Sequence, residues 1–278
     1  MNEKEKKMAG PYFIKHLVNK TFSQRFFWSK LSNIRGIGRL IEYALFEGDD
    51  ILYLPKDNTI PINQSLHRKE DMAIPSDVLT HFIKKANYRW IMNFCICRES
   101  TGCKDYPIEL GCLFLGEAAK GINPKFGRPA SEKEALDHAE KCREAGLVHL
   151  VGRNKLDTVW LNIRPGEKLL TVCHCCPCCC LWKVLPVISP NISAKVTRMP
   201  GISVRVTEEC VGCGACTKEI CFVNAIHLDG ERAVIGEDCR GCGRCVSVCK
   251  KGAIELVVDN RSFVDDAINR ISGLVDVT

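Results

Sequence analysis

The sequence contains no run of about 18 apolar residues, so it predicts no membrane-spanning helix. It begins MNEKEKK, with no apolar stretch or small-residue cleavage site behind it, and therefore predicts no secretory signal. A Walker A sequence is also lacking. The short Gly36-Ile37-Gly38 has neither a third glycine nor a preceding strand, so it is not a nucleotide fingerprint. No group of residues is typical of a hydrolase or a transferase.

The net positive charge is confined to one segment. The net charge is +6, but residues 1–40 hold nine basic and two acidic residues, which gives +7 there and −1 elsewhere. Apolar residues recur through this leader at helical spacing, namely Ile14, Leu17, Val18, Phe22 and Phe26. We expect a helix packed on the main domain, with docking of residues 1–40 on an anionic membrane surface as the alternative. A nucleic-acid partner is not expected.

Cysteine is abundant, with 19 residues. So many cysteines indicate either disulfides in a secreted protein or metal ligands in a reduced one. The odd count, the missing signal and the many C-x-x-C spacings favour metal ligands. We therefore expect a cytoplasmic protein, from an organism or niche with little oxygen, whose basic leader also allows peripheral association with a membrane.

Two similar units lie near the carboxyl end, and they read CVGCGACTKEIC and CRGCGRCVSVC. Three thiolates at C-x2-C-x2-C surround one face of an iron–sulfur cube, and the fourth ligand comes from the distant cysteine of the other unit. One predicted [4Fe–4S] cluster is thus held by Cys210, Cys213, Cys216 and Cys249, and the other by Cys239, Cys242, Cys245 and Cys221.

Over residues 202–258 this pattern resembles the bacterial two-cluster ferredoxins. The resemblance implies a small pseudo-twofold α+β domain and low-potential electron transfer. Cys216 and Cys221 are separated by four residues where the family has three, and the usual proline after the fourth cysteine is Phe222 or Lys250. Two four-cysteine zinc sites are the alternative, disfavoured because zinc sites rarely interleave two such runs.

Two further cysteine groups precede this domain, and they predict an additional cluster or zinc site whose ligand subset the sequence leaves open. Arg98 lies within the first group and suggests a loop that stabilises thiolates. The alternative, that the cysteines are buried small hydrophobes, fits Cys142 best. The groups are Cys95, Cys97, Cys103 and Cys112, and then Cys173, Cys175, Cys176, Cys178, Cys179 and Cys180.

The whole chain is similar to a family of uncharacterised cysteine-rich ferredoxin-type proteins of anaerobes, through CICR (95–98), GCLFLGEAAKGI (111–122), EAGLVHL (144–150) and CHCCPCCC (173–180). We predict an α+β protein whose N-terminal part is a mixed α/β domain. The expected parts are a basic leader (1–46), a cysteine-rich domain (47–185), a linker (186–201), a ferredoxin domain (202–258) and a C-terminal tail (259–278).

Within the cysteine-rich domain the pattern predicts a strand at 88–97, a capped helix at 131–145 and short strands at 147–151, 157–163 and 168–172. We expect His138 on the exposed side of that helix, and His149 as a core histidine with its hydrogen bonds satisfied.

An iron–sulfur electron-transfer protein with a redox partner protein is the favoured function. The alternatives are a redox enzyme whose N-terminal cysteine site is fed by the ferredoxin domain, and a metal-binding sensor or interaction module. An electron carrier fits the motifs better than a stand-alone enzyme; if the chain is an enzyme, we expect an oxidoreductase.

Overall fold

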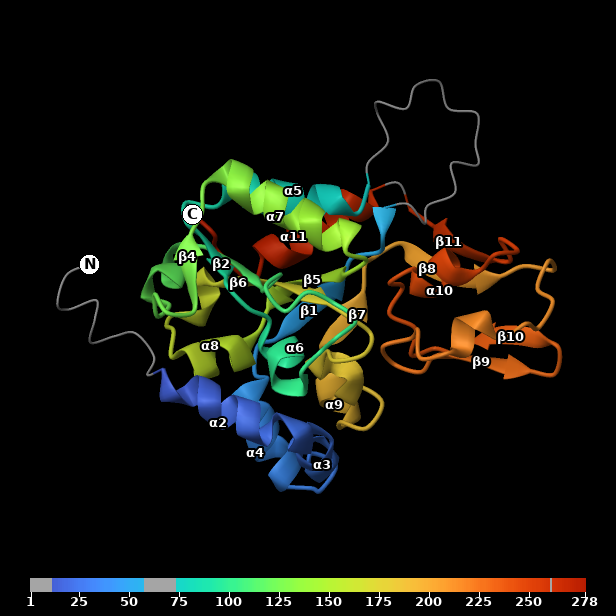
Figure 1. Ribbon diagram of the computed structural model, residues 1–278, viewed down its shortest axis with the longest axis horizontal. Helices are drawn as coiled ribbons and strands as arrows, with labels where there is room; N and C mark the ends of the chain where they lie inside the picture. The colour runs from blue at the N-terminus through green and yellow to red at the C-terminus, as the bar shows by residue number, and fades with distance from the viewer. Residues whose placement is uncertain (1–11, 58–73, 261) are drawn as a thin grey trace.

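The computed structural model describes residues 12–57, 74–260 and 262–278, and contains both helices and strands (Figure 1). The first eleven residues of the basic leader lie outside the described part. No helix of the described ranges is long and apolar enough to cross a membrane.

A seven-stranded sheet forms the centre of the chain, in the order β4-β2-β3-β6-β5-β1-β7. All neighbours are antiparallel except β1 and β7, which are parallel. The long β6 lies in the middle, so its side chains are covered on both faces. The strands are β1 (Asp50–Tyr53), β2 (Arg89–Met92), β3 (Leu113–Leu115), β4 (Gly127–Pro129), β5 (Val148–Arg153), β6 (Leu170–Cys175) and β7 (Val196–Arg198).

Three helices cover one face of the sheet (Figure 1), namely α5 (Ser76–Lys85), α7 (Glu132–Glu144) and α11 (Phe263–Ser272). α7 is the predicted capped helix, and Ser131 and Glu134 form its capping box. α11 lies in the segment expected as a tail, yet its Ala267 and Ile271 are buried in the main core with Phe82 of α5. The C-terminus therefore returns to the sheet.

The opposite face carries α6 (Ile96–Thr101) and α8 (Lys155–Leu161). α8 corrects our prediction of a strand at 157–163. Asp157 in its first turn accepts hydrogen bonds from Trp160 Nε1 (2.9 Å) and Asn154 Nδ2 (2.7 Å), and these local bonds favour a helix over a strand. The predicted strand 88–97 likewise ends at Met92, before α6 begins.

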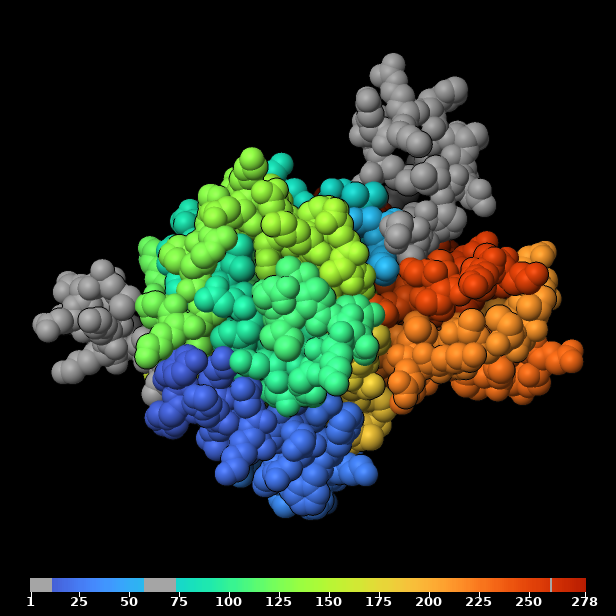
Figure 2. Space-filling model, viewed as in Figure 1, coloured from blue at the N-terminus to red at the C-terminus, as the bar shows by residue number. Residues whose placement is uncertain are grey.

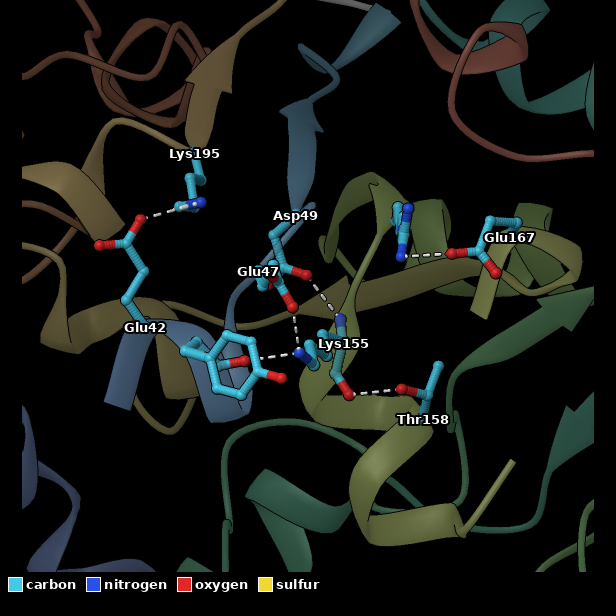
Figure 3. Close-up of polar contacts among 9 residues, drawn as sticks. Glu42, Glu47, Asp49, Lys155, Thr158, Glu167 and Lys195 are labelled. Carbon is cyan, nitrogen blue, oxygen red and sulfur yellow. Dashed lines mark hydrogen bonds and ion pairs between the residues drawn. The ribbon is translucent and has the colours of Figure 1, made fainter. Parts of the chain in front are cut away.

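The leader forms α2 (Phe13–Thr21), α3 (Arg25–Leu31) and α4 (Ile37–Leu45). Ile14 and Val18 of α2 pack on an aromatic cluster of the main domain, whereas Leu17, expected on the same buried face, is 56% exposed. Ion pairs tie α4 and the turn after it to the body (Figure 3): Glu42 of α4 pairs with Lys195 (3.2 Å), and Glu47 of the turn pairs with Lys155 (2.9 Å).

The C-terminal unit consists of two small antiparallel sheets, β8 with β11 and β9 with β10, which extend to one side of the body (Figures 1 and 2). It is not isolated, because Ile202 of β8 and Leu256 of β11 are buried in the main core. Its elements are β8 (Ile202–Val206), β9 (Ile226–Asp229), β10 (Arg232–Ile235), α10 (Arg244–Val248) and β11 (Ile254–Val258).

The remaining short helices connect these elements. They are α9 (Pro190–Ser193) and the 3-10 turns η1 (Phe22–Gln24), η3 (Glu117–Gly121), η4 (Gly166–Lys168), η5 (Leu181–Val184) and η6 (Ala215–Thr217).

Candidate metal and cluster sites

A cavity of about 330 Å³, here called the first cavity, lies between β9, β10 and the loop that follows β8. Four cysteines line it, three from the first C-x2-C-x2-C run and one from the end of the second. Cys213 is exposed, and Val211 beside it is 60% exposed, so this cavity lies near solvent. The four cysteines are Cys210, Cys213, Cys216 and Cys249.

A second cavity of about 400 Å³ lies closer to the body of the protein. Desolvation by the surrounding residues raises the pKa of Cys242 to about 12, although Cys242 is only half-buried. Phe222 and Arg244 also line this cavity. Its four cysteines are Cys221, Cys239, Cys242 and Cys245, so each cavity combines residues from both repeats.

The backbone around both cavities suits bound thiolates. Gly212 has a φ of 63°, and a Cβ there would lie 2.4 Å from the Glu231 carbonyl oxygen, so only glycine fits. Backbone N–H groups point at the sulfurs, as Ala233 N does at Cys210 Sγ (3.4 Å) and Ala225 N at Cys221 Sγ (3.3 Å). Such donors stabilise negative charge on ligand sulfur, and they lower the pKa of Cys210.

Both departures from the ferredoxin pattern have a structural counterpart. The longer Cys216–Cys221 loop places Glu219 in the left-handed region with a φ of 55°. Phe222, which stands where the family has proline, is 2% exposed, and its ring centroid lies 5.5 Å from that of Tyr53 in β1. The replacement of proline therefore creates a contact between the C-terminal unit and the sheet.

The N-terminal cysteines separate into two sets. One set, here called the outer quartet, has all four sulfurs within 4.8 Å of one another. Cys178 Sγ lies 3.6 Å from Cys103 Sγ and 3.4 Å from Cys179 Sγ. The outer quartet joins the loop after α6 to the turn after β6, and consists of Cys103, Cys176, Cys178 and Cys179.

The other six cysteines form a second set, the inner group, on the side of the sheet opposite α5 and α7. Cys112 Sγ lies 3.8 Å from Cys173 Sγ, and the thiol of Cys175 interacts with those of Cys173 and Cys180. A hydrogen bond from Cys97 lowers the pKa of Cys95, with help from the Arg98 charge and against the effect of burial. The members are Cys95, Cys97, Cys112, Cys173, Cys175 and Cys180.

Arg98 is fully buried between the two sets. Its guanidinium donates to the His174 carbonyl (2.8 Å) and to the Leu110 carbonyl, while its Nε has no partner among the described residues. Burial lowers the Arg98 pKa, but the nearby cysteines together, with Cys95 and Cys176 the largest contributors among them, outweigh burial and raise it. The sequence suggested a loop here, but Arg98 lies in α6, where its charge is next to cysteines of both sets.

Three histidines lie behind the cysteines, on the α7 side of the sheet. His138 is 8% exposed and contacts the Gly111 carbonyl (2.9 Å), so our expectation of an exposed position was wrong. His149 pairs with His174 across β5 and β6 (Nδ1 to Nδ1, 2.7 Å), but its Nε2 has no partner in the described ranges. Cys142 is buried 3.8 Å from His138, outside both cysteine sets.

Sequence reasoning missed the residues that join the two parts of the chain. Tyr53 is fully buried, and the cysteines that raise its pKa, after burial itself, include Cys180 of the inner group and Cys242 of the second cavity. Arg244 donates to Tyr106 Oη (2.8 Å) and to the Gly146 carbonyl (2.7 Å). No spacing in the sequence identifies these contacts, because they join residues far apart in the chain.

Comparison with known proteins adds one match. The model of the 4Fe-4S binding domain family matches residues 233–255, which contain Cys239, Cys242, Cys245 and Cys249. No curated protein and no solved structure matches the chain. The C-terminal unit is thus an iron–sulfur domain with at least one 4Fe-4S cluster, and the other cysteine sets permit further metal sites.

Proposed function

We propose that this protein transfers electrons through two [4Fe–4S] clusters, one in each cavity of the C-terminal unit, to a further centre at the inner group. The observation that carries the proposal is the interleaving of the two repeats. Each cavity is lined by three cysteines of one run and the last cysteine of the other. This is the ligand arrangement of two-cluster ferredoxins.

The residues fit the clusters beyond the number of thiols. Backbone N–H groups face Cys210, Cys221 and Cys239, the last from Gly241 N (3.4 Å). A bound cluster supplies one-electron chemistry, and hydrogen bonds to its sulfurs together with burial adjust its potential. The first cavity is the more exposed, so its cluster is the natural entry point for electrons from outside.

A redox partner protein would dock beside this cavity. Val211 and Leu228 line it together with Cys213 and are 60% and 41% exposed, which leaves apolar side chains exposed at this cavity. Apolar patches with a polar surround are typical of protein interaction sites.

The second cavity faces the inner group. Cys175 and Cys180 share one apolar cluster with Phe222 and Tyr53, and Cys242 packs against it. This arrangement brings the second cavity and the inner group together at one apolar cluster. An electron carried by the C-terminal unit would therefore pass to thiol ligands of the N-terminal domain.

The test is iron and sulfide analysis of the full chain, prepared without oxygen. We expect at least about eight iron atoms and as many sulfides per chain from the C-terminal unit alone. Cys213→Ser and Cys245→Ser should each alter one of two EPR signals. A preparation without iron and sulfide would refute the proposal. A small molecule that shifts a signal assigned to the inner group would favour the enzyme alternative.

We also propose that the leader docks on an anionic membrane surface. Trp28 (52%), Leu40 (67%) and Tyr43 (65%) are exposed, and Lys30 and Arg39 lie exposed among them. Exposed aromatic and basic residues on short helices are typical of interfacial docking. The cysteines of the chain are free, which fits a reducing cytoplasmic location. The leader would then meet the membrane from the cytoplasmic side.

A further inference from the structure

The distances between sulfurs distinguish the outer quartet from the cysteines of the C-terminal cavities. In a tetrahedral four-thiolate site with bonds of about 2.3 Å to the metal, neighbouring sulfurs lie about 3.8 Å apart. Cys178 Sγ lies 3.6 Å from Cys103 Sγ and 3.4 Å from Cys179 Sγ, and the whole quartet fits within 4.8 Å.

The C-terminal cysteines differ. No three of them come within 4.8 Å of one another in the part of the chain that the structure describes, and they line open cavities instead. This is expected for a cubane, since each thiolate there binds a different iron and the four sulfurs lie further apart than around one ion. The sulfurs of the quartet, all within 4.8 Å of one another, have the closer spacing expected around one ion.

We propose that Cys103, Cys176, Cys178 and Cys179 bind a single tetrahedral zinc ion. Zinc is favoured over ferrous iron at such a site by the general order of affinities for divalent metals. This inference deepens the proposed function, because it assigns four of the ten N-terminal cysteines to a structural ion and leaves the inner group for redox chemistry.

The surroundings suit four thiolates around a divalent ion, which together carry a net charge of −2. The buried Arg98 guanidinium acts electrostatically on Cys176 and offsets part of that charge. Backbone N–H groups of Tyr106 and Asp105 face the Cys103 sulfur, as expected of groups that orient metal ligands.

The ion would hold the loop that contacts the C-terminal unit. Cys103 begins this loop, and three residues later Tyr106 accepts a hydrogen bond from Arg244 (2.8 Å), which also lines the second cavity. Bound to Cys103 and the turn after β6, zinc would fix the position of Tyr106. The site therefore supports docking between the two parts of the chain.

The test compares metal and sulfide contents of full-length variants prepared without oxygen. Cys178→Ala and Cys103→Ala should each lose one zinc per chain and keep the iron and sulfide content of the parent protein. Retained iron and sulfide also show that the variants fold. Leu147→Ala is the matched control, because Leu147 is buried in the same apolar cluster and offers no metal ligand, and it should keep the zinc.

Two results would overturn the inference: loss of about four irons and four sulfides with Cys178→Ala, which would mean a cubane, or a parent protein without zinc. Both are read independently of the proposed function, which fails if the parent protein holds fewer than about eight irons and eight sulfides. As a second readout, hydrogen exchange at 103–110 should accelerate in Cys178→Ala and not in Leu147→Ala.

Discussion

Replacing Phe222 with alanine should separate the C-terminal unit from the sheet. Phe222 follows the last cysteine of the first repeat, is 2% exposed, and packs on Tyr53 with ring centroids 5.5 Å apart. Because the side chain fills the junction of the two parts, its removal leaves a cavity there. The equivalent position in the second repeat is Lys250, which is exposed, so Lys250→Ala is the matched control.

The expected magnitude follows from burial. Truncation of a buried phenylalanine costs roughly 3 to 5 kcal/mol, whereas an exposed substitution changes stability by about 0.5 kcal/mol or less. If all of this free energy is lost from the docking of the C-terminal unit on the sheet, the ratio of docked to undocked forms drops by about two to four orders of magnitude. The cysteines are untouched, so the iron content should stay at the parent value.

Hydrogen exchange of the clustered protein without oxygen is the measurement. Phe222→Ala should accelerate exchange in β1 (Asp50–Tyr53) and at 222–226, while Lys250→Ala leaves both at the parent rate. Electron transfer from the C-terminal unit to the inner group should slow in parallel. Equal protection in the two variants would show that Phe222 does not dock the unit, and the route through Tyr53 would then be rejected.

Three further results are expected. Arg98→Met should cost about 3 kcal/mol or more and lower the metal content measured by elemental analysis, because it leaves buried thiolate charge uncompensated; an unchanged metal content would contradict this role. Burial raises the pKa of Asp49 to about 7, so its protonated form is favoured on folding, and stability should fall as pH rises from about 4 to about 7. Asp49→Asn should flatten that part of a denaturation series, and an unchanged slope would refute the assignment. Trp28→Ala should weaken binding to anionic vesicles at low salt without changing the melting temperature, as Trp28 is 52% exposed; equal binding by parent and variant would end the membrane proposal.

Most of what the sequence alone predicts follows from the spacing of the C-terminal cysteines. C-x2-C-x2-C brings three sulfurs to one centre through local backbone geometry, so the expected ligand sets need little knowledge of the rest of the chain. The capping box at Ser131 is local in the same way, and the structure contains it. Asp157 shows the limit: the apolar pattern around it suggested a strand, and side-chain hydrogen bonds within four residues favoured a helix.

The partition of the N-terminal cysteines was decided only by tertiary structure. β6 directs Cys173 and Cys175 to one face and His174 to the other, because side chains alternate along a strand. The chain then turns, and Cys178 meets Cys103, which is 75 residues away. Which distant sulfurs share a centre depends on how the strands pair and where the loops return. The spacing of residues in the sequence shows neither.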